Sequence, residues 1–315
     1  MILINKKILS AFMLTIFFLF ALCDKGLAQV QEIPGFGSYE IFSAPTVQEP
    51  VRKRESLFSL TARNALNING LGGLFVANTA DKLEEGTMFV SGRYRFHKIT
   101  SHMGKALYST EKGDVHTFEA SVNWVGEFAE WAVTIPMHSW SLSAPRTFRN
   151  SAIEDNGLGN LRFAWKATYL PDKSYYRFAY GAIADVNTGH PEAMVVAGAK
   201  DSDELTLFGV VTTQETDRAT ANLELGAILN SEGENNRFLY RLGLTYEATE
   251  HASLIGELAG EVEGGKDKDS LDLIAGIRFT ADRRFILEFA YTRNLRTYRP
   301  FGWDDRLHTG FTFNW

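Results

Sequence analysis

The sequence predicts an all-β protein, a transmembrane antiparallel up-and-down β-barrel of about 12 strands with an N-terminal signal peptide. Three observations predict it: an apolar leader, regular alternation of apolar and polar residues from Gly86 onward, and an aromatic last residue, Trp315. Alternation gives a strand one apolar and one polar face. Only helices and closed barrels satisfy every backbone polar group inside lipid.

The leader has the three parts of a secretory signal peptide. Lys6 and Lys7 precede an apolar run from Ile8 to Cys23, and small residues occupy Gly26 and Ala28. We therefore expect cleavage after residue 28. The apolar run is short for a membrane-spanning helix. In the alternative interpretation Cys23 is lipid-modified, although the preceding Leu22 is large for that cleavage pocket.

Composition narrows the class of the remaining chain. Removal of residues 1–28 removes the only cysteine, which excludes a disulfide scaffold, and leaves a net charge of −8, which argues against a nucleic-acid partner. No later stretch reaches the roughly 18 apolar residues of a spanning helix. An exported, alternating chain of this kind is either a soluble periplasmic β-protein or a barrel.

Residues 29–85 show no clear period. Three prolines, Pro34, Pro45 and Pro50, indicate an irregular periplasmic segment. The glycine-rich stretch Asn69 to Ala77 forms either a short plug that enters the lumen or an extra strand pair. It is no nucleotide-binding loop, because no βαβ pattern follows. We thus predict a signal peptide (1–28), an N-terminal segment (29–85) and a barrel (86–315).

The alternation after Gly86 divides into strands. We expect them at 86–98, 117–125, 128–137, 159–170, 175–186, 204–212, 218–230, 237–248, 252–262, 270–280, 284–292 and 306–315. The links on one side are mostly long, at 99–116, 138–157, 187–203, 231–236, 263–269 and 293–304, whereas those on the other side are mostly tight turns. Outer-membrane barrels sort their loops in this way, and soluble sandwiches have no reason to do so.

Aromatic residues recur near the predicted strand ends. They are Tyr94, Phe96, Trp124, Trp131, Tyr169, Tyr176, Tyr246, Tyr291 and Trp315. Such positions suit girdles at the two membrane interfaces, and the alternative is aromatic pairing across a soluble sheet. In the last strand, Phe311, Phe313 and Trp315 resemble the signal that the barrel-assembly machinery reads.

Short motifs add a family resemblance over residues 80–315. Gly157-Leu158-Gly159-Asn160 followed by Lys166-Ala167-Thr168-Tyr169 resembles a strand of the meta-pathway phenol-degradation-like outer-membrane transporters. Gly86–Phe89 with Tyr94–Phe96 is similar to their first strand, and Ser253–Leu258 to a late one. The chain departs from the family at Asn160, where Asp is usual. The resemblance implies passage of small molecules, among them hydrophobic or aromatic compounds.

Charged residues on the polar faces are the candidate site. A charge facing lipid costs about 2–4 kcal/mol near the midplane, so these side chains must face the lumen. The expected lumen-lining residues are Arg93, Arg95, Arg162, Lys166, Arg177, Glu224, Arg241, Glu257, Glu261, Arg278 and Glu288. They form either a basic wall opposite an acidic wall, or a set of interior salt bridges that fills the barrel.

The sequence suggests no cofactor, no metal site and no enzyme. His102, His116, His138, His190 and His308 are expected on the outer side, at spacings that match no metal-ligand motif. Ser139 beside His138 suggests a lipid hydrolase, but no Gly-x-Ser-x-Gly occurs and adjacency in sequence is not a spatial triad.

The predicted function is that of a channel in the cell outer membrane for small molecules. The alternative is a structural or adhesive barrel with a filled lumen. Expected partners are membrane lipid, the assembly machinery and a small-molecule solute. The apolar Met194–Ala197 in the link 187–203 suggests a loop that folds inward as a constriction.

Overall fold

The computed structural model describes residues 65–99, 112–143, 153–169, 176–190, 202–214, 218–231, 236–263, 269–281, 284–296 and 303–315. The predicted signal peptide, residues 29–64 and most of the predicted outer links, including Met194–Ala197, lie outside these ranges. The division of the chain into three parts stays a prediction.

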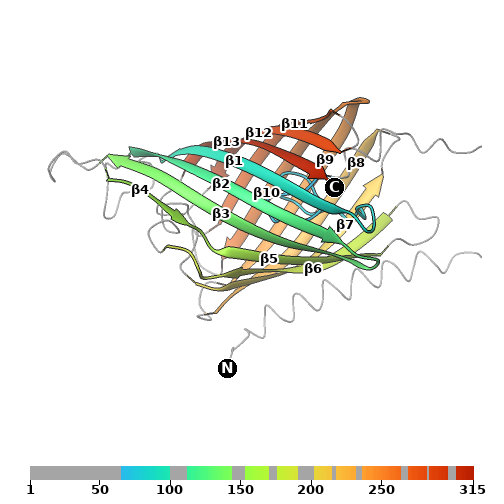
Figure 1. Ribbon diagram of the computed structural model, residues 1–315, viewed down its shortest axis with the longest axis horizontal. Helices are drawn as coiled ribbons and strands as arrows, with labels where there is room; N and C mark the ends of the chain where they lie inside the picture. The colour runs from blue at the N-terminus through green and yellow to red at the C-terminus, as the bar shows by residue number, and fades with distance from the viewer. Residues whose placement is uncertain are drawn as a thin grey trace, which may run out of the picture.

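Within the described residues, thirteen strands make one antiparallel sheet (Figure 1). They are β1 (Met88–Ile99), β2 (Lys112–Val125), β3 (Ala129–Ser143), β4 (Ile153–Leu158), β5 (Leu161–Tyr169), β6 (Tyr176–Val186), β7 (Glu204–Gln214), β8 (Ala219–Asn230), β9 (Arg237–Thr249), β10 (Ala252–Glu263), β11 (Ser270–Thr280), β12 (Phe285–Arg296) and β13 (Trp303–Asn314). The sheet closes on itself because β1 pairs with both β2 and β13. The predicted up-and-down barrel is confirmed.

β4 and β5 share one position in the ring. β3 pairs with β5 over Ala129–Thr134 and with β4 over Met137–Leu142. The strand opposite β3 is therefore interrupted only at Gly159-Asn160, where the Gly159 amide donates to the Pro136 carbonyl at 2.9 Å. Counting this pair as one strand gives the predicted 12-strand ring.

The prediction of a loop over 138–157 is wrong for its two ends. Residues 138–143 extend β3, and residues 153–157 belong to β4. At this level of β3 the polar Ser139 is exposed and faces outward, whereas Trp140 is buried and faces inward. The polarity of the two faces is thus reversed here. A prediction that requires an apolar outer face therefore ends this strand too early, at residue 137.

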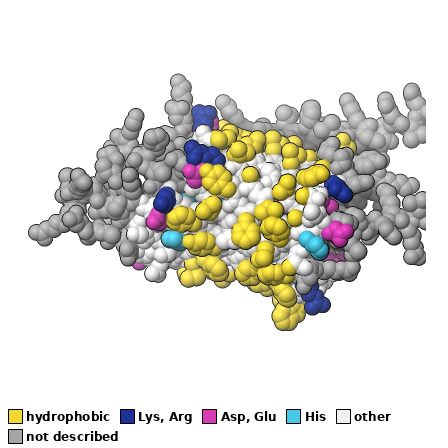
Figure 2. Space-filling model, turned by 90° about the horizontal axis from the view of Figure 1, so that it is seen from above, with side chains coloured by type: hydrophobic (Ala, Val, Ile, Leu, Met, Phe, Trp, Pro, Cys, Tyr) yellow, Lys and Arg dark blue, Asp and Glu magenta, His cyan; other side chains and the backbone are white. Residues whose placement is uncertain are grey.

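The barrel has an apolar outer surface and a polar interior. Outward side chains include exposed Val133, Leu242, Leu244 and Phe289, whereas inward ones include buried Glu119, Lys166 and Glu288. Figure 2 shows the hydrophobic side chains across the middle of one face, with charged side chains toward both ends. A closed ring with this arrangement suits lipid outside and polar groups inside.

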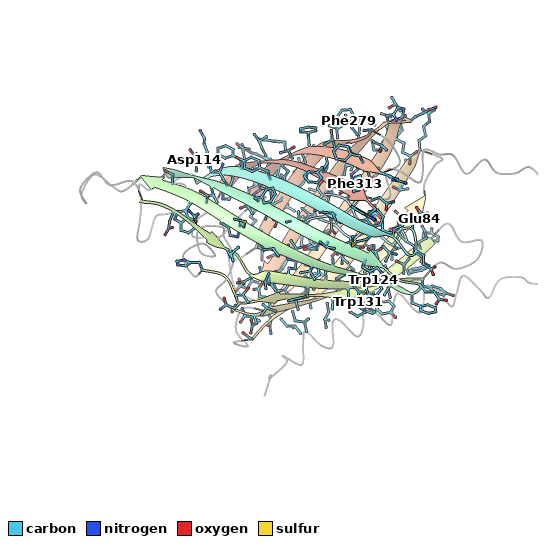
Figure 3. The ribbon with its side chains drawn as sticks, in the orientation of Figure 1. Glu84, Asp114, Trp124, Trp131, Phe279 and Phe313 are labelled. Carbon is cyan, nitrogen blue, oxygen red and sulfur yellow. The ribbon has the colours of Figure 1, made fainter. Side chains whose placement is uncertain are left out.

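The aromatic residues predicted near strand ends project outward. Trp124 and Trp131 are opposite each other on β2 and β3 and are 63% and 55% exposed, and Trp315 is 81% exposed. Figure 3 shows the two tryptophans near the end of the barrel where Glu84 lies, far from Asp114. Strongly exposed tryptophans at a strand end suit a membrane interface. Within the described ranges, no helix has the length and apolar character needed to cross a membrane.

Residues 65–85, which we call the inner segment, lie inside the ring and lead through Gly86 into β1 (Figure 1). The segment forms two isolated bridges with itself, Leu66 with Gly72 and Gly73 with Asn78, and a few backbone hydrogen bonds of its own. Its apolar side chains pack on inward wall residues: Leu71 on the cluster that holds Ile183 and Phe208, and Leu74 and Phe75 on the cluster that holds Ile255 and Ile274. Leu66, Leu71 and Ala77 are completely buried.

Candidate functional site

Three carboxylates of the wall hold the inner segment by its backbone amides. Glu257 of β10 accepts hydrogen bonds from the amides of Phe75 (2.6 Å), Val76 (3.2 Å) and Ala77 (2.8 Å). Glu224 of β8 accepts from both the backbone amide and the side-chain amide of Asn78, at 2.8 and 2.9 Å. Glu130 of β3 accepts from the Gly72 amide at 2.9 Å. Hydrogen bonds to an ionised group are stronger than neutral ones.

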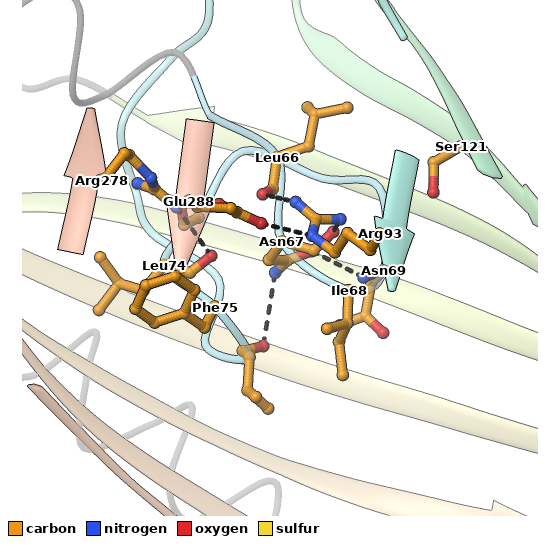
Figure 4. A network of polar contacts seen from close by, with 12 residues as sticks. Leu66, Asn67, Ile68, Asn69, Leu74, Phe75, Arg93, Ser121, Arg278 and Glu288 are labelled. Atoms are coloured by element: carbon orange, nitrogen blue, oxygen red, sulfur yellow. Dashed lines mark hydrogen bonds and ion pairs between the residues drawn. The ribbon is translucent and has the colours of Figure 1, made fainter. Parts of the chain in front are cut away.

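Cationic side chains hold the same segment by its carbonyl groups. Arg93 donates to the carbonyls of Leu66 and Asn67. Lys166 donates to the carbonyls of Gly72 and Thr79, both at 2.9 Å. Figure 4 shows Glu288 between Arg278 and Arg93, with Asn67 and Leu74 of the segment close by. The segment carries little secondary structure of its own, so these contacts satisfy backbone groups that burial would otherwise leave without partners.

A second cationic group of contacts extends along the segment. Arg278 donates to the carbonyls of Gly73 and Leu74 at 3.2 Å, and Arg162 donates to the carbonyl of Ile68 at 2.9 Å. Arg177 forms an ion pair of 2.5 Å with Asp81 of the segment. The segment is therefore tied to the wall from Leu66 to Asp81.

The wall charges also pair with one another. Glu288 bridges Arg93 at 2.6 Å and Arg278 at 3.2 Å. Lys166 lies 3.0 Å from Glu130, and both are almost completely buried. Removal of one partner from a buried pair costs about 3–5 kcal/mol, because the other charge is left uncompensated. The network thus positions the charges as well as the segment.

The predicted lumen residues all lie on inward positions. Eight of them contact the inner segment directly: Arg93, Arg162, Lys166, Arg177, Glu224, Arg241, Glu257 and Arg278. The other three form ion pairs within the wall: Arg95 with Glu119 at 2.5 Å, Glu261 with Arg237 at 2.5 Å, and Glu288 as described. Their role in selecting a solute stays a prediction.

The predicted separation into a basic and an acidic wall needs correction. Glu119, Glu130 and Asp185 lie on the side expected to be basic, and each pairs with a cation there. Arg237, Arg241 and Arg278 lie on the side expected to be acidic. Buried charges need partners within hydrogen-bond reach, which interleaves the signs. Glu119 follows the outward Phe118 and Glu130 precedes the outward Trp131, so the alternation of each strand held a signal that could have identified both carboxylates.

His138 and Ser139 point to opposite faces of β3. His138 is buried in the lumen with its Nδ1 3.0 Å from the Thr117 hydroxyl, whereas Ser139 faces outward. This geometry cannot make the hydrogen-bonded nucleophile and base of a hydrolase. His102 lies outside the described ranges. In the part of the chain that the structure covers, no group of three or more His, Cys, Asp and Glu side chains is placed to hold a metal ion.

Small cavities remain beside the inner segment. One of about 20 Å³ is lined by Leu74, Asp81, Asn222 and Arg278, among others. Another of about 10 Å³ lies near Lys82, Phe128 and Lys166. A volume of this size holds about one water molecule.

The fold and its interior define a class: a transmembrane β-barrel whose lumen holds a segment of its own chain. No family model matches the sequence, and no curated relative matches it. Among solved structures, an outer membrane channel from Pseudomonas putida F1 is similar with a TM-score of 0.60 and 12% identity, over 77% of this chain and 100% of that one. This likeness supports the fold.

Two further barrels are more distant. The NanC porin gives a TM-score of 0.48 at 8% identity, over 72% of this chain and 98% of that one. The CymD monoaromatic hydrocarbon channel gives 0.43 at 8% identity, over 74% and 88%.

Proposed function

We propose that this protein is a channel of the cell outer membrane for small molecules, and that the inner segment controls its lumen. One observation carries the proposal: the wall holds the segment through hydrogen bonds between charged side chains and its backbone. Glu257 and Glu224 accept from its amides, and Lys166 donates to its carbonyls. Replacement of a buried ion pair by well-packed hydrophobic residues often leaves the stability of the fold unchanged or raises it. A barrel filled only for stability therefore has no need of this network.

Polar contacts of this kind can be exchanged for contacts with water. When the segment shifts, the Glu257 carboxylate and the amides of Phe75 to Ala77 gain water as a partner. The apolar clusters around Leu71 and Phe75 oppose the shift, so the closed state dominates. We therefore infer a channel that is closed in its resting state and that opens when the segment moves.

The sequence resemblance to phenol-degradation-like transporters supports small aromatic or hydrophobic solutes. The second candidate function is a structural or adhesive barrel with a filled lumen. The apolar packing of the inner segment on the wall and the single-water cavities favour that alternative. The two functions differ in one property, because only the first allows solute to cross.

Uptake by liposomes that carry the refolded protein tests the proposal. We expect uptake of a small aromatic acid to exceed that of a sugar of similar size. Deletion of residues 65–85, and separately the double variant Glu224→Gln/Glu257→Gln, should raise uptake. The matched control is Glu261→Gln, which lies on the inner face of the same strand as Glu257 and pairs with Arg237. Absence of uptake for the wild type and both opened variants would establish the filled barrel.

We further propose that the barrel-assembly machinery recognises the last strand. Phe311 is 40% exposed on the outer face, and the Trp315 amide donates to the Met88 carbonyl across the closing seam at 2.8 Å. Slower membrane assembly of Trp315→Ala in cells would support this; an unchanged rate would count against it.

A further inference from the structure

A group of polar side chains lies on the lumen wall away from the inner segment. We call it the outer patch: Arg95 and His97 on β1, Arg306 and His308 on β13, Thr117 on β2 and His138 on β3. All six occupy inward positions near the strand ends that lead into the long links.

The sheet register places these side chains in two adjacent rows. In one row His308 is opposite Arg95, Arg95 is opposite Thr117, and Thr117 is opposite His138. In the next row Arg306 is opposite His97. Opposite residues of neighbouring antiparallel strands have Cβ atoms about 4.5–5.5 Å apart, so the six side chains form one continuous surface.

The outer patch offers nitrogen donors and lacks a carboxylate of its own. Glu119 lies one row deeper and accepts from Nη2 of Arg95 at 2.5 Å. Nε of Arg95 is buried and has no hydrogen-bond partner within the described part of the chain. A guanidinium that engages one carboxylate through Nη2 still presents Nε to a second acceptor.

The patch remains accessible on its β1 and β13 side. The Arg95 side chain keeps 15% of its surface exposed, and Arg306 and His308 are half-buried. His308 is oriented by a 2.8 Å hydrogen bond between its Nε2 and the Thr292 hydroxyl. A neutral imidazole keeps one N–H donor beside its acceptor nitrogen, so the ring can take part in a hydrogen-bonded site without a charge of its own.

We propose that the outer patch binds the carboxylate group of a small organic acid. Arginine donors match the geometry of a carboxylate, and the low dielectric of a protein interior strengthens such contacts relative to bulk water. This inference deepens the proposed channel function and relies on it for the purpose of the site. Binding itself is measurable without any passage across the membrane.

Calorimetric titration of the full chain in detergent micelles tests the inference. The probes are benzoate and benzyl alcohol, which share the aromatic ring and differ in the carboxylate. We expect benzoate to bind one per chain, at least about tenfold more tightly than benzyl alcohol, because a charge-assisted hydrogen bond exceeds a neutral one by about that factor. Equal binding of the two probes, or no binding of benzoate, would overturn the inference.

Variants locate the site. Arg95→Gln and His308→Gln should each weaken benzoate binding at least about fivefold, the factor expected from loss of one charged or oriented donor. The matched control is Arg237→Gln, another inward arginine near the outer strand ends, which pairs with Glu204 and Glu261. It should leave benzoate affinity unchanged. Equal losses in Arg95→Gln and Arg237→Gln would also overturn the inference.

Heat-modifiable gel migration of each variant verifies that the barrel is folded. Failure of the channel function and failure of this inference are distinguishable. Intact benzoate binding without liposome uptake contradicts only the channel. Intact uptake without benzoate binding contradicts only the outer patch.

Discussion

The carboxylate of Glu257 accepts a hydrogen bond of 2.6 Å from the backbone amide of Phe75, a residue 182 positions earlier in the chain. The same carboxylate also accepts from the next two amides. A single inward side chain of β10 therefore binds three consecutive backbone amides of the inner segment. This relationship gives the first testable prediction.

Glu257→Gln should loosen the inner segment without unfolding the barrel. A neutral amide has one acceptor oxygen in place of two, so the variant loses charge-assisted hydrogen bonds of about 1.5–3 kcal/mol each. Hydrogen exchange at the amides of Phe75 and Ala77 should accelerate by at least about tenfold. Glu261→Gln on the same strand should leave these amides protected. Unchanged exchange in Glu257→Gln would contradict the assigned clamp.

Lys166→Met should destabilise the protein strongly. It leaves the Glu130 carboxylate buried and also removes the donor to the carbonyls of Gly72 and Thr79. We expect a loss of about 3–5 kcal/mol in the free energy of unfolding. The double variant Glu130→Gln/Lys166→Met should recover part of it, as measured by urea unfolding in detergent. Additive losses from the two changes would show that the pair is not coupled.

Two glycines of positive φ allow strain and crowding to be separated. Gly70 has φ of 75° and a Cβ there would lie 3.0 Å from both Ala132 Cβ and Thr134 Oγ1. Gly86 has φ of 74° and open space around it. Gly86→Ala should cost about 1–2 kcal/mol from backbone strain alone. Gly70→Ala should carry the same strain and, in addition, lower the free energy of unfolding by about 1–3 kcal/mol because of overpacking. Equal unfolding free energies for the two variants would show that residue 70 is not packed on the wall.

A charged substitution on the outward face should destabilise the barrel more, the deeper it lies in the membrane. Leu242 lies near the middle of β9, and Phe238 lies near its outer end. Leu242→Arg should cost about 2–4 kcal/mol, whereas Phe238→Arg should cost about 0–1 kcal/mol. Unfolding from lipid bilayers measures both. If the two costs are equal, the membrane does not lie across the middle of the strands.

Much of the fold could be predicted because, in a membrane barrel, outward apolar residues alternate with inward polar residues along each strand. Leu242 and Leu244 are outward and Arg241 is inward for a reason that is local in sequence. The prediction failed near Ser139 and Trp140, where the polarity of the faces is reversed. Successive side chains still alternate between the two faces there. The outer face is polar at Ser139, however, so a search for an apolar outer face missed this part of the strand.

The site was predicted less completely than the fold. Periodicity identified Glu224 and Glu257 as inward, but it does not show which partner a side chain meets across the lumen. The contact of Glu224 with Asn78 joins residues 146 positions apart, and no local pattern encodes it. For the same reason, the sequence left two interpretations of the inner segment open, a plug and an extra strand pair. Its backbone is bound by side chains and not by a neighbouring strand, a relationship that hydropathy does not report.

Covalent attachment of the inner segment to β1 at Gly86 makes the segment a tethered ligand of its own barrel. Its local concentration near Glu257 and Glu224 is set by the length of the connection and not by the amount of protein in the membrane. Dilution cannot remove it, and in the proposed open state the tether should keep the segment close to its binding site. Substitutions that weaken the clamp should therefore change the fraction of time that the lumen is free, and they should do so reversibly and equally in a sparse and in a crowded membrane.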